Sequence, residues 1–143
     1  QVVGIDYWGV DFGYNQAMCE KNAASEGVAA RCRFQHGDAN KLDFPDESFD
    51  AVVSNYVYHN VMGADKQALL LETLRVLKKG GVFALNDDMK PKLYGDMDVF
   101  AQKLREMGYQ DVRLIDTAEE AFGSHRRAAM MMLGSSRLLV GRK

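Results

Sequence analysis

Short apolar runs and stretches of helical periodicity alternate along most of the chain. Residues 2–5 and 49–54 are apolar runs of the kind found in buried strands. Between them, residues 15–26 have the periodicity of a helix, with Asn15 as N-cap and Gly27 as its stop. This alternation predicts an α/β fold with a mostly parallel sheet and crossover helices.

The pattern continues to the end of the chain. Asp65 is expected to cap a helix whose apolar stripe is Leu70, Leu74 and Leu77, with Gly80 and Gly81 ending it. Residues 32–36 alternate polar and apolar side chains, which predicts an edge strand. Further strands are expected at 82–85, 112–115 and 137–141, and further helices at 96–107, with Phe100, Leu104 and Met107 on its apolar face, and at 125–133. The last connections are short, so one of these strands is expected to run antiparallel at the sheet edge.

Length and composition fit one domain over residues 1–143. Apolar residues make up 47% and charged residues 27% of the chain, and the formal net charge is −2. Lysines and arginines are scattered, so we expect neither a nucleic-acid footprint nor a membrane surface. Cys19 and Cys32 lack metal-ligand spacing, so no metal site is expected, and two lone thiols favour a cytoplasmic location.

Candidate ligand-binding residues follow the first strand, because open α/β sheets bind ligands at the carboxyl ends of their strands. Asp6 can accept two hydrogen bonds from the ribose hydroxyls of a nucleotide-like ligand. Trp8, two residues on, offers a flat face for a purine ring. Its alternative role is a partly buried core aromatic residue, and the sequence alone favours neither.

The second strand is followed by Gly37, Asp38 and Ala39. The Asp38 carboxylate can accept a hydrogen bond from an exocyclic amine, and the small Ala39 leaves its backbone N–H open to a ring nitrogen. The competing interpretation is an ordinary turn cap, because aspartate is common in turns.

Polar residues also follow the third strand, where they would face the reacting end of a ligand. Ser54, Asn55 and Tyr56 come first. Tyr58 and His59 come next, and His59 is a candidate general base because an imidazole titrates near working pH. A hydrogen-bonded structural histidine is the alternative, and the two tyrosines can equally pack on a neighbouring helix.

Three segments resemble one family in order and spacing. They are Val-Val-Gly-Ile-Asp ending at Asp6, the stretch 37–55, and Leu-Arg-Val-Leu-Lys-Lys-Gly-Gly-Val-Phe at 74–83. Together they resemble class I S-adenosylmethionine-dependent methyltransferases of the small-molecule type. The resemblance covers nearly the whole chain, with 37–81 as its specific part. It implies a Rossmann-like fold with helices on both faces of the sheet, S-adenosylmethionine as cofactor and methyl transfer to an acceptor.

The resemblance also implies a role for each candidate residue. It assigns Asp6 to the ribose hydroxyls, Tyr7 and Trp8 to the side of the adenine, Asp38 and Ala39 to the adenine edge, and Ser54, Asn55 and Tyr56 to the methionine end of the cofactor. A base is needed only where the acceptor is protonated, and His59 or Tyr58 is the candidate.

The chain departs from the family pattern at its start. The first strand and the glycine-rich loop of the family do not precede Val2, which indicates a truncated domain that is inactive by itself. In the family order, that strand lies between those at 2–5 and 49–54. We therefore expect these two strands either to pair with each other or to borrow backbone from a second copy in a homodimer.

Two other functions compete with small-molecule methyl transfer. A nicotinamide-dependent oxidoreductase also has an acidic residue after its second strand, although the segments at 37–39 and 45–50 fit it less well. A degenerate domain that binds a partner without chemistry is the other alternative.

Overall fold

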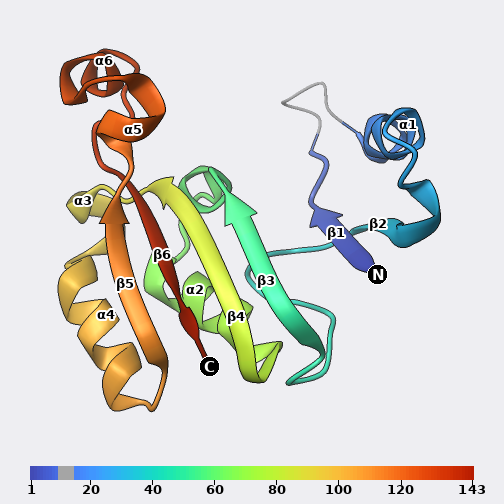
Figure 1. The fold of residues 1–143 in the computed structure, drawn as a ribbon, viewed down its shortest axis with the longest axis horizontal. Helices are drawn as coiled ribbons and strands as arrows, with labels where there is room; N and C mark the ends of the chain where they lie inside the picture. The colour runs from blue at the N-terminus through green and yellow to red at the C-terminus, as the bar shows by residue number, and fades with distance from the viewer. Residues whose placement is uncertain (10–14) are drawn as a thin grey trace. The chain divides into compact units, whose positions relative to one another are not determined.

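The computed structural model describes residues 1–9 and 15–143 and shows two compact units, residues 1–43 and residues 44–143 (Figure 1). Each unit is described by itself. The smaller unit contains β1 (Val2–Asp6), α1 (Gln16–Ser25), the short 3-10 helix η2 (Ala29–Arg31) and β2 (Cys32–His36).

The smaller unit is a parallel strand pair joined through one helix. β1 and β2 run in register from Val2 opposite Cys32 to Asp6 opposite His36. Asn15 caps α1, since its side chain accepts a hydrogen bond from the backbone N–H of Met18 at 3.1 Å. Both predicted strands and the predicted helix are therefore confirmed.

The larger unit contains all the remaining elements. They are β3 (Phe49–Asn55), η3 (Tyr58–Asn60), α2 (Lys66–Arg75), β4 (Leu77–Asp88), α3 (Pro91–Tyr94), α4 (Met97–Glu106), β5 (Gln110–Asp116), α5 (Ala118–Phe122), α6 (His125–Met130) and β6 (Ser136–Arg142). Asp65 and Asp96 cap α2 and α4 as predicted, each with its carboxylate accepting two backbone N–H groups.

The sheet of the larger unit has the strand order β3-β4-β6-β5 (Figure 1). β3 and β4 are parallel, whereas β6 is antiparallel to both β4 and β5. The predicted antiparallel strand near the carboxyl terminus is thus confirmed. The carboxyl ends of β3, β4 and β5 and the start of β6 meet at one edge, called the carboxyl edge below.

Buried apolar side chains from α2, α4 and the strands form the core of this unit. They include Leu70, Leu74, Phe83, Leu85, Phe100, Leu104 and Leu139. The opposite face of β3 is open, because Val53 is 80% exposed. Gly141 is needed where β6 passes Phe83, since a β-carbon there would lie 2.6 Å from the ring.

Several predicted details of the helices and strands differ from the structure. The helix after Asp65 ends at Arg75, and Leu77 is the first residue of β4. Gly80 and Gly81 lie inside β4 instead of ending a helix. A β-carbon on Gly81 would sit 2.8 Å from the Asp50 carbonyl oxygen, so Gly81 allows the close approach of β3, whereas Gly80 adopts a φ of +78°. Met107 is the C-cap of α4 and is 54% exposed, so it lies outside the apolar face.

Some elements had no counterpart in the sequence pattern. α3 and α5 are four and five residues long, too short to show a helical period. The helix expected at 125–133 is the six-residue α6, which ends at Met130.

Each of the two strands flanking the expected gap is paired within its own unit. Among the described residues, β1 pairs with β2 in the smaller unit and β3 pairs with β4 in the larger unit. Pairing of β1 with β3, or with a second copy, stays a prediction.

Candidate functional site

The carboxyl ends of β1 and β2 place Asp6 beside the segment that begins at Gly37. The Asp6 carbonyl oxygen accepts the Gly37 N–H at 3.0 Å. Its side-chain oxygen Oδ1 accepts the N–H of Trp8, also at 3.0 Å. This tight turn holds Trp8 at a φ of +43°. Asp6 is exposed, and in the described ranges no donor hydrogen-bonds to its Oδ2, which is open to accept from a ligand.

Two aromatic side chains follow Asp6. Tyr7 is 64% exposed, and its ring centroid lies 5.0 Å from that of His36 at an interplanar angle of 51°. The indole Nε1 of Trp8 is buried and has no hydrogen-bond partner in the described part of the chain. A buried donor without an acceptor is costly, so a ligand that supplies an acceptor would be favoured there.

Asp38 caps the turn after β2. Its Oδ1 accepts both the backbone N–H and the side-chain Nδ2–H of Asn40, each at 2.8 Å. These hydrogen bonds lower the pKa of Asp38, so its carboxyl is an ionised acceptor at neutral pH. The turn-cap interpretation describes this geometry, and Ala39 beside it is half-buried.

A chain of polar side chains crosses the carboxyl edge of the larger unit. Asn86 Nδ2 donates to Asn55 Oδ1 at 2.8 Å, and Asn86 Oδ1 accepts from the Thr117 hydroxyl at 3.1 Å. The hydroxyl groups of Thr117 and Tyr56 both meet that of Ser136. Three strands, β3, β4 and β6, and the residue that follows β5 therefore contribute to one hydrogen-bonded network at this edge.

The predicted residues of this unit divide between two environments. Ser54 and Asn55 are consecutive in β3, so their side chains point to opposite faces, and only Asn55 joins the network. Tyr58 is buried, and its hydroxyl meets that of Thr73 at 2.7 Å. Burial raises the pKa of Tyr58. A buried tyrosine whose pKa is raised does not suit a general base, which leaves His59 as the candidate for that role.

His59 and Asp87 form a hydrogen-bonded pair. The imidazole Nδ1 lies 2.5 Å from Asp87 Oδ1, and the side chains of His59 and Asp87 are 27% and 1% exposed. A carboxylate at Nδ1 selects the tautomer that carries its proton there. Nε2 is then left with a free lone pair, which is the arrangement of an imidazole that can accept a proton.

Asp87 also fixes the backbone around His59. Its Oδ2 accepts the N–H groups of Tyr58 at 2.8 Å and His59 at 3.3 Å, and its Oδ1 accepts the N–H of Asp88 at 2.7 Å. The sequence analysis missed Asp87 because it ended the strand at residue 85. A strand carried on to the acidic pair 87–88 would have placed two carboxylates at the carboxyl edge.

The family is decided by a comparison with protein-family models. A model described as a methyltransferase domain matches residues 1–85, which is more than half of the chain. The chain belongs to the methyltransferase domain family. With this match, the resemblance to class I S-adenosylmethionine-dependent methyltransferases is confirmed.

Two curated relatives of this methyltransferase domain have names that specify a small molecule as the methyl acceptor. The demethylmenaquinone methyltransferase of Listeria monocytogenes serotype 4a is 36% identical over 92 residues, which are 64% of this chain and 38% of that protein. The sterol 24-C-methyltransferase ERG6B of Gibberella zeae is 31% identical over 100 residues, which are 70% of this chain and 25% of that protein. The chain therefore matches well under half the length of either relative.

A solved structure confirms the fold. The structure titled a putative sarcosine dimethylglycine methyltransferase from Galdieria sulphuraria matches with a TM-score of 0.68 at 15% identity, over 99% of this chain and 69% of that one. At this identity the likeness supports a Rossmann-like fold, as predicted, and carries no information on substrate.

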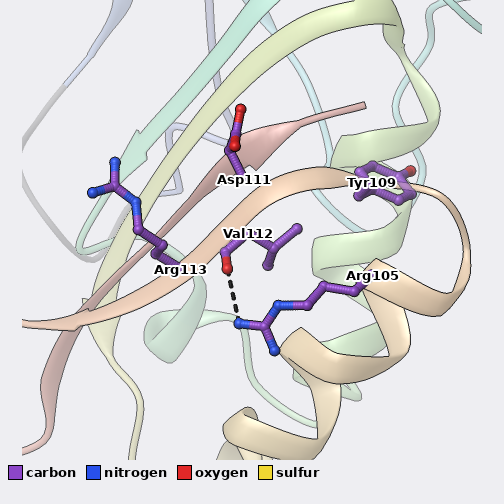
Figure 2. Close-up of a pocket in the computed structure, with 5 residues that line it drawn as sticks. All are labelled: Arg105, Tyr109, Asp111, Val112 and Arg113. Carbon is purple, nitrogen blue, oxygen red and sulfur yellow. Dashed lines mark hydrogen bonds between the residues drawn. The ribbon is translucent and has the colours of Figure 1, made fainter.

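A depression of about 690 Å³ lies away from the carboxyl edge of the methyltransferase domain, between the end of α4 and the start of β5 (Figure 2). Arg105, Tyr109, Asp111, Val112 and Arg113 line it. Figure 2 shows Arg105 reaching the Val112 carbonyl oxygen, at 2.8 Å, so its guanidinium holds α4 against β5. We assign the depression no part in the site.

Within the described ranges, no three His, Cys, Asp or Glu side chains are grouped so as to hold a metal ion. The same residues include no helix with the length and apolar character needed to cross a membrane.

The buried side chain of Tyr94 lies near Asp87, and its hydroxyl lacks a well-formed hydrogen bond in the described part of the chain. It is almost fully buried, and the hydroxyl has no hydrogen-bond partner among the described residues. Burial raises the pKa of Tyr94, and the negative charge of Asp87 adds to this effect.

We expect Tyr94→Phe to change the free energy of unfolding by less than about 1 kcal/mol, because the buried hydroxyl forms no well-aligned hydrogen bond although it lies close enough to Asp87 to interact with it. Urea unfolding at pH 7 measures this, with Tyr109→Phe, whose side chain is half-buried, as the matched control expected to change stability by less than about 0.5 kcal/mol. The pKa of Tyr94 is higher in the folded protein than in the unfolded chain, so Tyr94 ionises first in the unfolded chain. The free energy of unfolding of the wild type therefore falls as pH rises above about 10. That fall should be smaller in Tyr94→Phe. A variant that loses about 1 kcal/mol or more would show that the hydroxyl has a partner.

Proposed function

We propose that the protein catalyses S-adenosylmethionine-dependent methyl transfer to a small-molecule acceptor whose attacking atom carries a proton. The observation that carries this proposal is the His59–Asp87 pair at the carboxyl edge of a methyltransferase domain. The family match favours this reaction over nicotinamide-dependent hydride transfer.

The residues of the smaller unit fit the adenosine part of the cofactor. Asp6 has an exposed carboxylate oxygen for ribose hydroxyls, and Tyr7 and Trp8 offer aromatic surface beside it. The buried indole N–H of Trp8 lacks an acceptor among the described residues, and an acceptor atom of a bound nucleoside would supply one. Asp38, ionised and next to Ala39, is suited to accept from an exocyclic amine.

The residues of the larger unit fit the methionine end and the acceptor. Asn55 and Tyr56 contribute amide and hydroxyl groups from the carboxyl edge, with Ser54 behind them on β3. The cofactor, when bound, supplies a methyl group that is already activated. The protein therefore contributes mainly position and orientation, worth about 7–11 kcal/mol in favourable cases.

His59 would remove the proton of the acceptor. Asp87 holds the proton on Nδ1, so Nε2 would take the proton of the acceptor as the acceptor atom bonded the methyl group and the bond between that methyl group and the cofactor sulfur broke. Two relatives bear the names of enzymes that methylate lipophilic small molecules, a demethylmenaquinone and a sterol, which supports an acceptor of this general class.

Further proposals concern the whole protein. We infer that the two units belong to one methyltransferase domain, because the family match at residues 1–85 runs across the boundary at 43/44. We also propose a cytoplasmic protein without nucleic-acid partners. The strands β1 and β3, each paired on one side only among the described residues, are proposed as the edges of a homodimer.

The cofactor site is tested by titrating S-adenosylhomocysteine into the protein in a calorimeter. Asp6→Ala should weaken binding about 10- to 100-fold, because it removes charge-assisted hydrogen bonds to the ribose. Glu26→Ala, an exposed acidic residue at the end of α1, is the matched control and should bind as the wild type does. Equal binding by Asp6→Ala would refute the assigned site. A wild-type protein that binds no cofactor would agree with the expectation that residues 1–143 are inactive by themselves and would favour the non-catalytic alternative.

The general base is tested by methyl-transfer rates on a panel of phenols, enols and amines. His59→Gln should lower kcat by about 10²- to 10⁴-fold, the usual contribution of a general base. His125→Gln, which alters an exposed histidine of α6, should leave the rate unchanged. If His59→Gln turned over at the wild-type rate, His59 would be removed from the mechanism.

A further inference from the structure

Lys66 is buried in a place where lysine is rarely found. It is the first residue of α2, and its side chain is 3% exposed although the capping Asp65 before it is exposed. Transfer of an ammonium group from water into a protein interior is costly unless the charge is paired and hydrogen-bonded. An apolar residue would fill the same space without this cost, so the charge needs an explanation.

The ammonium group of Lys66 holds one end of the turn that carries His59. Its Nζ donates to the carbonyl oxygen of Val61, the C-cap residue of η3. At the other end of the turn, Asp87 accepts the N–H groups of Tyr58 and His59. Two buried groups of opposite charge therefore clamp the same short helix from its two ends.

The charges around the clamp are unequally compensated. Asp88, the neighbour of Asp87, has its own cation, because Lys90 Nζ lies 2.6 Å from its Oδ2. Asp87 is not within ion-pair distance of a lysine or arginine among the described residues. Asp87 nevertheless interacts electrostatically with Lys66. Burial is the larger effect on Lys66 and lowers its pKa, and the negative charge of Asp87 opposes that shift. Lys66 is thus a buried cation that interacts electrostatically with the carboxylate of Asp87, the hydrogen-bond partner of His59.

We propose that Lys66 is a positioning residue for His59, holding the turn 58–61 so that Nδ1 of the imidazole stays on Asp87 and Nε2 faces the acceptor. The catalytic importance of this clamp rests on the proposed function, whereas its effect on the imidazole does not. Val61 carries the effect, since loss of Lys66 leaves its carbonyl oxygen without that donor and frees the end of η3.

The tautomer of His59 provides a readout that a change in global stability would not produce. Nitrogen-15 spectra of the imidazole ring, recorded at about pH 8.5 to keep histidines neutral, report which nitrogen carries the proton. In the wild type, His59 should be protonated on Nδ1. In Lys66→Met the ratio of the two tautomers should fall about fivefold, the effect of one weakened hydrogen bond. His36 and His125 give internal controls in the same spectrum.

Matched variants separate charge, hydrogen bonding and bulk. Lys66→Arg keeps a cationic donor and should restore the wild-type spectrum of His59. Lys92→Met, which removes an exposed lysine of α3, should have no effect. Lys66→Leu, which has no donor and is uncharged, serves if the methionine variant does not fold, and it should also lose the tautomer preference.

The outcomes separate this inference from the proposed reaction. A folded Lys66→Met or Lys66→Leu protein with the wild-type His59 spectrum would overturn the positioning role, whether or not methyl transfer is observed. A changed spectrum that Lys66→Arg restores would support it. If methyl transfer is also found, kcat should fall about tenfold in Lys66→Met with KM for the cofactor unchanged.

Discussion

The buried carboxylate of Asp87 is the constraint on which the carboxyl edge of the larger unit depends. A carboxylate that is 1% exposed must find donors inside the protein, and three backbone N–H groups and the imidazole of His59 supply them. Satisfying this one group fixes the chain after β3 against the end of β4. The position of His59 follows from that fixed turn instead of from its own packing.

The same edge shows how a sheet can carry chemistry at its strand ends. Asn55, Asn86, Thr117 and Ser136 come from four segments and complete each other's hydrogen bonds. Such a network resists rearrangement, because moving one member leaves another unsatisfied. Tyr56 belongs to this network through the Ser136 hydroxyl, and His59 is held beside it by Asp87. The smaller unit uses a simpler device, a tight turn at Asp6 that presents two aromatic rings.

Local patterns were enough to predict most of the elements and part of the site. The caps at Asn15, Asp65 and Asp96 and the strand at 49–54 depend on near neighbours in sequence, so the sequence alone predicts them. The pair Gly80-Gly81 misled the prediction because the close approach of Gly81 to Asp50 arises only when β3 pairs with β4. His59 was identifiable by its residue type, whereas Asp87 lies 28 residues further on and becomes its partner only through the fold.

The most direct test of the central role of Asp87 is amide hydrogen exchange in the wild type and in Asp87→Asn. The carboxylate account predicts that the amides of Tyr58 and His59 are protected in the wild type and exchange about tenfold faster in the variant. The amide of Leu85, inside the β4 ladder, should keep its protection in both proteins. Unchanged exchange at Tyr58 and His59 would contradict the account, because the turn would then be held by something other than Asp87.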